Sequence, residues 1–253
     1  MTTADQTLVQ LAKDVSAGGG LKVWSVIVTL LGDRVRHDMD PLPSKDLMAV
    51  LGLLGISPES IRVALHRLRR DGWIVAHKSG RTSSYSLTPK AQEETLAVAP
   101  QIYEARLVAP ATLSLCVFRD AGPAMAWVEQ ISSRNVLWLH DMAIVTFEDR
   151  VPHTQDAICF PVQAQTLPEW IRSRADRALD LQRIQDVLDV MCALGRLDLT
   201  EKDEKRAARL LALHAWRRVI LKTNFAAFAL SEGAEIYQKS QGKLEQILKS
   251  FPV

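Results

Sequence analysis

The chain has 253 residues, of which 47% are hydrophobic and 24% charged, and its formal net charge is +2. This length exceeds that of a usual single domain, so we expect two or three domains. No apolar run is long enough to cross a bilayer, and no secretory signal is visible, so we expect a soluble cytoplasmic protein without membrane association. Three widely spaced cysteines, Cys116, Cys159 and Cys192, are too few for a disulfide framework or a structural metal site and fit a reducing compartment.

Three helices are expected in the first fifty-five residues. Apolar side chains recur at helical spacing within residues 4–16, and a flexible linker, Ser16 to Gly20, follows. An apolar helix is expected over residues 22–35. The next helix covers residues 44–54, with Ser44 as its N-cap and a glycine closing it.

A further helix opens at Ser57, an N-cap that proline follows, and stops at Gly72. Its apolar residues repeat at steps of three and four and must face the core: Ile61, Ala64, Leu65 and Leu68. Its arginines are left on the exposed side. Residues 73–76 and 85–88 then bracket the basic, glycine-containing tip from Lys78 to Arg81, which predicts a β-hairpin.

The remaining chain predicts two more domains and an α+β multidomain class. Strand-like runs and one helix between residues 112 and 162 indicate a small α+β domain, which looks like a ferredoxin-like fold, and strong helical patterns follow Pro168. The expected division is 1–20, an N-terminal helix and linker; 21–95, a winged helix-turn-helix; 96–165, the ferredoxin-like α+β domain; and 166–253, an all-α helical domain.

The order helix, helix, basic helix, hairpin is that of a winged helix-turn-helix, whose recognition helix enters the major groove of DNA. Residues 57–90 carry a charge of +5 and the rest of the chain −3, so the basic footprint is local. An arginine guanidinium can donate two hydrogen bonds to O6 and N7 of guanine, and basic or hydroxyl side chains on the wing can contact phosphates. The expected DNA-binding residues are Ser60, Arg62, His66, Arg67, Arg69, Arg70, Lys78, Arg81 and Ser83.

Several short segments have a recognisable sequence: Gly55-Ile56-Ser57, Ile61 to Leu65, Arg67-Leu68, Asp71-Gly72-Trp73, Gly80-Arg81, Tyr85 to Thr88, Trp24 to Asp33 and Arg209 to Arg218. Together they resemble the PaaX family of repressors of phenylacetate catabolism. The resemblance implies a repressor, commonly dimeric, that an aromatic acyl-CoA such as phenylacetyl-CoA releases from DNA. After Lys222 the chain departs from the family, which usually has a proline-rich turn and a tryptophan there, whereas Thr223 to Ala229 follow in this sequence.

A coenzyme A thioester needs cations for its phosphates and an apolar slot for its acyl group. The candidate effector-binding residues are Arg209, His214, Trp216, Arg217, Arg218 and, in the middle domain, Trp138. The same helical cations equally suit an ordinary solvated face. A homodimer would place two recognition helices one DNA turn apart, so we expect the operator to be an inverted repeat in double-stranded DNA.

Two other functions stay open. Asp120 follows a strand as the metal-binding acid of a ferredoxin-like nuclease does, but a lone aspartate holds magnesium poorly. No metalloprotease, nucleotide-binding or serine-hydrolase motif is visible, so we expect no catalytic residue, no metal and no cofactor. The other alternative is an RNA-binding winged helix or a scaffold that uses its hairpin for protein contact. Duplex RNA hides the base edges that arginines read, which favours DNA over RNA.

Overall fold

The computed structural model describes residues 3–16, 21–103, 113–131, 133–147, 155–231, 234–251 and 253. Their helices are α1 (Thr3–Ser16), α2 (Val23–Arg36), α3 (Ser44–Leu53), α4 (Pro58–Arg70), α5 (Pro89–Tyr103), α6 (Ala121–Gln130), α7 (Glu169–Ala178), α8 (Leu181–Leu194), α9 (Lys202–Ile220), α10 (Phe225–Leu230) and α11 (Ala234–Ser250), with short 3₁₀ turns at Ser133–Asn135 and Ala164–Thr166. The strands are β1 (Leu42–Pro43), β2 (Ile74–Ser79), β3 (Thr82–Leu87), β4 (Leu113–Phe118), β5 (Val136–His140), β6 (Ala143–Phe147) and β7 (Ala157–Val162). The predicted mixed α+β class is confirmed.

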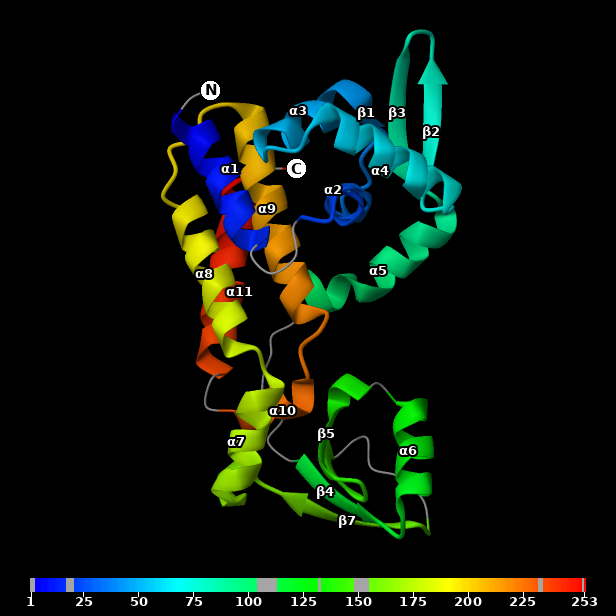
Figure 1. The fold of residues 1–253 in the computed structure, drawn as a ribbon, viewed down its shortest axis with the longest axis vertical. Helices are drawn as coiled ribbons and strands as arrows, with labels where there is room; N and C mark the ends of the chain where they lie inside the picture. Colours follow the sequence, from blue (N-terminus) through cyan, green and yellow to red (C-terminus); the bar gives the residue numbers. More distant parts are fainter. Residues whose placement is uncertain are drawn as a thin grey trace. The chain divides into compact units, whose positions relative to one another are not determined.

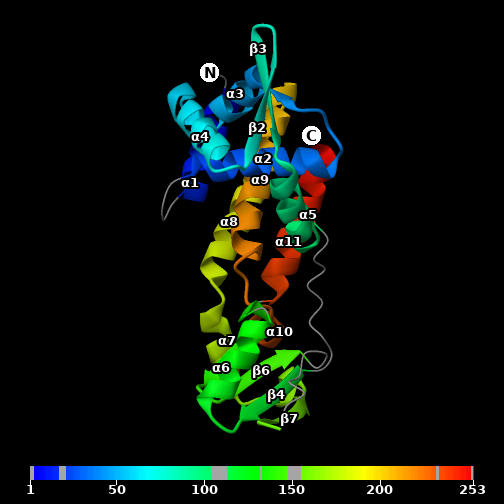
Figure 2. The same ribbon diagram turned by 90° about the vertical axis from the view of Figure 1, so that its right-hand side faces the viewer.

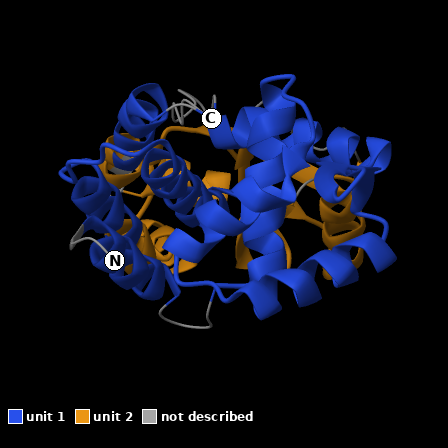
Figure 3. Cartoon of the chain, turned by 90° about the horizontal axis from the view of Figure 1, so that it is seen from above, with its two compact units in different colours: residues 1–105, 186–221, 240–253 blue, residues 106–185, 222–239 orange. Residues whose placement is uncertain are grey.

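The chain forms two compact units, coloured separately in Figure 3. Unit 1 comprises residues 1–105, 186–221 and 240–253, and unit 2 comprises residues 106–185 and 222–239. The residues of the predicted C-terminal domain are therefore shared between the units, with the boundaries falling inside α8 and α11. The expected division at residues 20, 95 and 165 stays a prediction, and the compact units do not follow it.

Unit 1 is built around α9, which contacts α1, α2, α3 and α5 and is buried over most of its length. Its sheet has the order β1-β3-β2. The hairpin β2–β3 projects beyond the neighbouring helices of this unit in both ribbon views (Figures 1 and 2). The short strand β1 was not predicted: Leu42 lies between two prolines, yet its backbone pairs with Tyr85 of β3 and its side chain is buried.

Helix α5 was also missed. It begins at Pro89, and the Thr88 hydroxyl accepts a hydrogen bond from the Ala91 amide while donating one to the Gly72 carbonyl oxygen. Proline at the first helical position after a threonine is a helix-start signal. The helix then extends to Tyr103, past the expected domain boundary at residue 95.

Unit 2 contains an antiparallel sheet of order β5-β6-β4-β7. Helix α6 packs on one face over an apolar cluster, whereas α7 and α10 contact β5 (Figure 1). Trp138 is half-buried and packs against that cluster. Cys116 and Cys159 lie directly opposite each other on β4 and β7 and form a disulfide. The expectation that the widely spaced cysteines stay unpaired is therefore wrong for these two, because the order of the strands brings them together.

Candidate functional site

Helix α4 carries the first candidate site, and its local sequence explains where it starts and stops. The Ser57 hydroxyl caps the N-terminus by accepting a hydrogen bond from the Ser60 amide at 3.2 Å. At the other end the Trp73 amide donates to the Leu68 carbonyl oxygen at 2.8 Å, and Gly72 has a φ of +73°. Glycine adopts this left-handed conformation without the steric cost that a Cβ imposes. The predicted helix limits are confirmed.

The two faces of α4 divide as its periodicity predicts. Ile61, Ala64, Leu65 and Leu68 are buried. The exposed side, together with the hairpin tip, forms what we call the basic surface: Arg62, His66, Arg67, Arg69, Arg70, Lys78 and Arg81. Ser60 is also exposed and Ser83 is half-buried on β3. The nine residues expected to bind DNA therefore lie on two consecutive structural elements of unit 1.

The arginines of the basic surface differ in how far they are neutralised. Asp71 accepts from Arg67 Nε at 3.4 Å and from Arg70 Nε at 3.1 Å. Among the described residues, Arg62 and Arg69 have no ion-pair partner. An exposed arginine without an ion pair has no existing interaction to break when it binds an external anion. Of the four arginines of α4, Arg62 and Arg69 are therefore the more available for binding DNA.

The hairpin presents its basic tip through a two-residue turn. Ser79 and Thr82 are the last paired residues, which leaves Gly80 and Arg81 at the turn. Gly80 has a φ of +58°, as a tight hairpin turn requires, and the Thr82 hydroxyl donates to the Ser79 carbonyl oxygen at 2.8 Å. Arg81 is consequently fixed at the end of a projecting hairpin.

Helix α9 carries the second candidate site, and most of its residues are buried rather than exposed to solvent. Arg209, His214 and Trp216 are 5%, 1% and 0% exposed. The indole of Trp216 donates to the Ile102 carbonyl oxygen at 2.9 Å. The alternative of an ordinary solvated face, which concerned the cations of this helix, is therefore wrong for Arg209. Arg217 and Arg218 are half-buried.

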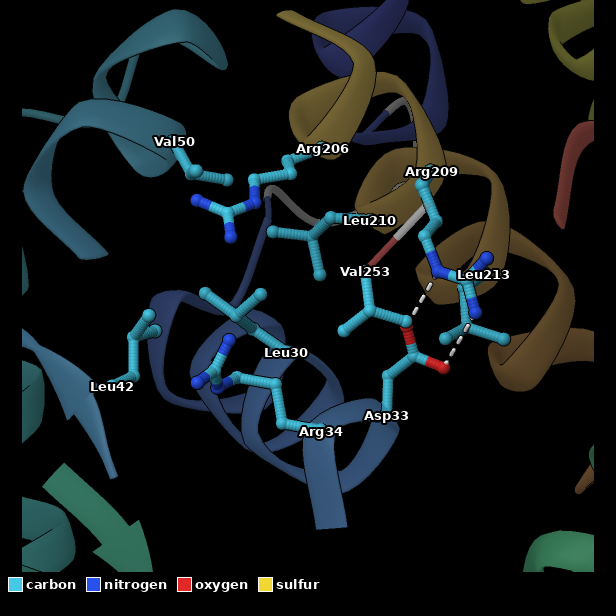
Figure 4. Close-up of a pocket in the computed structure, with 10 residues that line it drawn as sticks. All are labelled: Leu30, Asp33, Arg34, Leu42, Val50, Arg206, Arg209, Leu210, Leu213 and Val253. Atoms are coloured by element: carbon cyan, nitrogen blue, oxygen red, sulfur yellow. Dashed lines mark hydrogen bonds and ion pairs between the residues drawn. The ribbon is translucent and has the colours of Figure 1, made fainter. Parts of the chain in front are cut away.

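Arg209 forms a buried ion pair that no spacing in the sequence indicated. Its Nε and second guanidinium nitrogen donate to the two carboxylate oxygens of Asp33 at 2.7 and 3.0 Å (Figure 4). The third nitrogen donates to the carbonyl oxygens of Leu248 and Phe251. Tyr103 donates to the same carboxylate at 2.9 Å, and burial, reinforced by Asp33, raises the pKa of Tyr103 above its ordinary value.

His214 lies five residues further along α9. Its Nδ1 is 3.1 Å from the Thr29 hydroxyl, which also accepts from Arg217 at 3.2 Å. Its Nε2 has no hydrogen-bond partner among the described residues. Burial, followed by the charges of Arg218 and Arg217, lowers the pKa of His214 to about 3, so the ring is neutral at physiological pH.

The predicted sites are thus only partly brought together. Five of the six expected effector residues share α9, whereas Trp138 belongs to the other compact unit. Sequence interpretation missed the residues that face them on α2 and α5: Thr29, Asp33 and Tyr103. The sequence did contain one signal for this pairing, namely Asp33 within the largely apolar run of α2. A buried carboxylate needs a cationic or hydrogen-bonding partner.

Asp120, the candidate metal-binding acid of the nuclease alternative, has a structural role. Asp120 caps α6 by accepting from the Gly122 amide at 3.0 Å, and Arg119 donates to its carboxylate at 3.3 Å. Among the described residues, no group of three or more histidine, cysteine, aspartate or glutamate side chains is placed to hold a metal. Within the same residues, no helix has the length and apolarity needed to cross a membrane.

Comparisons with known proteins bear on the N-terminal segment. Residues 22–91 match the family model described as PaaX-like protein. The transcriptional repressor PaaX of Escherichia coli (strain K12) is 36% identical over 81 residues, which are 32% of this chain and 26% of the repressor. The match therefore spans about a quarter of that relative's length. These two findings confirm the PaaX resemblance inferred from the sequence.

A solved structure was also compared with the whole chain. The uncharacterized protein Rv0674 from Mycobacterium tuberculosis superposes with a TM-score of 0.44 at 14% identity, covering 89% of this chain and 95% of that one.

Proposed function

We propose that α2, α3, α4 and the hairpin form a winged helix-turn-helix and that the chain is a DNA-binding transcriptional repressor. The match of residues 22–91 to the PaaX-like family model and the similarity to the repressor PaaX support this proposal. The observation that carries the proposal is the basic surface, which lies entirely within the matched segment. Its helix and its hairpin tip are the two parts with which such a motif contacts the grooves and the phosphates.

Within this proposal the basic surface divides into two roles. Arg62, His66 and Arg69 are free to meet base edges in the major groove, where an arginine fork pairs with the O6 and N7 of guanine. Lys78 and Arg81 on the hairpin neutralise phosphates or enter the minor groove. Arg67, Arg70, Ser60 and Ser83 supply further backbone contacts.

Fluorescence anisotropy on duplex DNA from the region upstream of the gene tests the proposal, at stated salt because phosphate contacts are salt-dependent. We expect saturable binding to the DNA duplex and much weaker binding to a duplex RNA of the same sequence, whose deep major groove hides its base edges. Tighter binding to RNA would make the chain an RNA-binding protein instead. No binding to either at moderate salt would refute the proposal.

We further propose that an aromatic acyl-CoA such as phenylacetyl-CoA releases the repressor from DNA. In this proposal Arg217 and Arg218, half-buried on α9, meet the phosphates, whereas Arg209, His214 and Trp216 hold α9 in place because they are buried. Alanine at Arg217 and Arg218 should weaken the response to phenylacetyl-CoA and leave DNA affinity unchanged. Free coenzyme A is the matched control ligand, and an unchanged response would remove both arginines from the proposal.

We also propose a homodimer that reads an inverted repeat, because the two recognition helices of a symmetric dimer contact two half-sites. Half-sites about 34–36 Å apart correspond to one turn of DNA. An effector then weakens binding by favouring a dimer geometry with the wrong half-site spacing. Size-exclusion chromatography with light scattering tests the assembly, and a monomer at micromolar concentration would contradict it.

A further inference from the structure

Val63 is an apolar residue that the packing of α4 does not explain. Its side chain is 65% exposed, and no other large apolar side chain among the described residues is more exposed. It also lies inside a helix, where a β-branched residue is a poorer helix former than alanine, lysine or glutamate. Neither burial nor helix stability therefore accounts for a valine at this position.

The helical period places Val63 opposite the core. Val63 is two residues from both Ile61 and Leu65, which are buried, and two residues correspond to a rotation of about 200° around the helix axis. When the exposed face of α4 lies in a groove of DNA, the side chain of Val63 therefore points into that groove.

The side chains that surround Val63 on the helix surface are polar. Residues three and four positions apart are neighbours on a helix, so Val63 lies between Glu59 and Ser60 on one turn and His66 and Arg67 on the next. All four are exposed. Single exposed apolar residues are common on protein surfaces, but Val63 stands in the middle of the face proposed to contact DNA.

Space beside Val63 keeps its side chain accessible. A shallow depression, open to solvent, lies between α2 and α4, and Val63 forms part of its wall together with Val23 and Trp24. Trp24 is itself 37% exposed. An apolar group that approaches α4 from this side leaves water when it contacts Val63.

The major groove of DNA presents one apolar group that distinguishes a base, the C5-methyl of thymine. The other groups by which bases are distinguished there are hydrogen-bond donors and acceptors. The side chain of valine can neither donate nor accept a hydrogen bond, so it cannot select among those groups. It can only bury the methyl group.

We propose that Val63 contacts the C5-methyl of a thymine in the major groove and makes the protein prefer thymine at that position of its site. This inference rests on the proposed binding of double-stranded DNA by α4 and adds a base preference to it. The exposed arginines of α4 select guanine through hydrogen bonds, whereas Val63 selects thymine through burial of one methyl group.

Deoxyuridine tests the contact, because it differs from thymidine only in lacking the C5-methyl and keeps the same hydrogen-bonding edge. A duplex is selected from random sequence by the unaltered protein, and its thymines are then replaced by deoxyuridine one at a time. Fluorescence anisotropy should show about fourfold weaker binding at one thymine, or at two symmetry-related thymines of an inverted repeat. Replacement of the other thymines should have a smaller effect.

Two variants then assign the contact to Val63. Val63→Ser removes both methyl groups at a similar helix propensity and should bind the thymidine and deoxyuridine duplexes equally. Val63→Ile keeps a branched apolar side chain and should retain the preference for thymidine. Met125→Ser is the control, because it removes an apolar side chain of similar exposure on α6, outside residues 22–91, and should retain the preference.

Two results would overturn the inference and leave the proposed DNA binding standing. The first is equal affinity of the unaltered protein for thymidine and deoxyuridine at every position. The second is a preference for thymidine that persists unchanged in Val63→Ser, which would assign the methyl contact to another residue. Failure of the unaltered protein to bind any duplex would instead refute the proposed function, and this inference with it.

Discussion

Asp33 and Arg209, separated by 176 positions in the sequence, join α2 to α9 through a hydrogen bond of 2.7 Å between Arg209 Nε and a carboxylate oxygen. Both side chains are 6% exposed. Because α2 belongs to the segment proposed to bind DNA and α9 carries the proposed effector residues, this ion pair connects the two within unit 1.

Breaking the Asp33–Arg209 pair should destabilise the protein strongly. Asp33→Asn leaves the Arg209 charge buried without its partner, and loss of one member of a buried pair costs about 3–5 kcal/mol. Urea unfolding monitored by circular dichroism measures the change. Asp71→Asn is the matched control, since it removes the exposed partner of Arg67 and Arg70 and should cost less than about 1 kcal/mol. Equal losses in the two variants would contradict the importance of burial.

His214 should make stability depend on pH in a defined direction. Its folded pKa of about 3 lies below the ordinary histidine value of 6.5, so the unfolded chain takes up a proton first as the pH falls. Its contribution is complete above about pH 6.5 and is lost progressively down to about pH 3. From pH 7.5 to 5.0 this amounts to about 2 kcal/mol, at 1.36 kcal/mol per pKa unit.

The variant that checks this effect is His214→Gln, compared with the unaltered chain by urea unfolding at both pH values. The variant should lose less stability between pH 7.5 and 5.0 than the unaltered protein. His66→Gln, at an exposed position on α4, is the control and should retain the full pH dependence. Identical pH dependence in His214→Gln and the unaltered chain would show that His214 is not held neutral by burial.

The hairpin tip should contribute salt-dependent affinity rather than sequence preference. If Arg81 neutralises one phosphate, Arg81→Ala should reduce the slope of log affinity against log salt by about 0.9. Anisotropy at several salt concentrations measures the slope. Lys90→Ala, which removes an exposed cation on α5 that pairs with Glu94, is the control. A slope that stays the same in Arg81→Ala would place the hairpin tip away from DNA.

Two glycines near α4 should respond oppositely to alanine. At Gly72, with a φ of +73° and open space around the added Cβ, only backbone strain opposes the change, and we expect a loss of about 1–2 kcal/mol. At Gly52, inside α3 and also with open space, alanine should stabilise by about 0.5–1 kcal/mol. Chemical unfolding distinguishes the two, and a shared sign would contradict the conformational explanation.

Local structure was predictable because its causes are local. The three- and four-residue spacing of Ile61, Leu65 and Leu68, together with the capping by Ser57 and the stop at Gly72, identified α4 without any knowledge of its neighbours. The same holds for the hairpin, because its two-residue turn requires a residue with positive φ, and Gly80 supplies it. The exposed basic surface follows directly from the buried face of α4.

Pairings between distant residues were not predictable in this way. Arg209 carries the same sequence signal whether it faces solvent or Asp33, because helical spacing describes one helix and not what covers it. Similarly, Cys116 and Cys159 are 43 residues apart, and their pairing depends on β4 and β7 being neighbours in the sheet. The sequence pattern predicted both strands but not their order.

The most direct test of DNA binding through α4 compares the unaltered protein with Arg62→Ala/Arg69→Ala on a duplex selected from random sequence by the unaltered protein. Each good arginine contact with a base is worth about 1–3 kcal/mol, so the double variant should bind at least tenfold more weakly and lose discrimination against a scrambled duplex. Arg196→Gln removes an exposed cation outside residues 22–91 and is the control, which should bind as the unaltered chain does. Unchanged affinity and discrimination in the double variant would contradict recognition of DNA by the exposed face of α4.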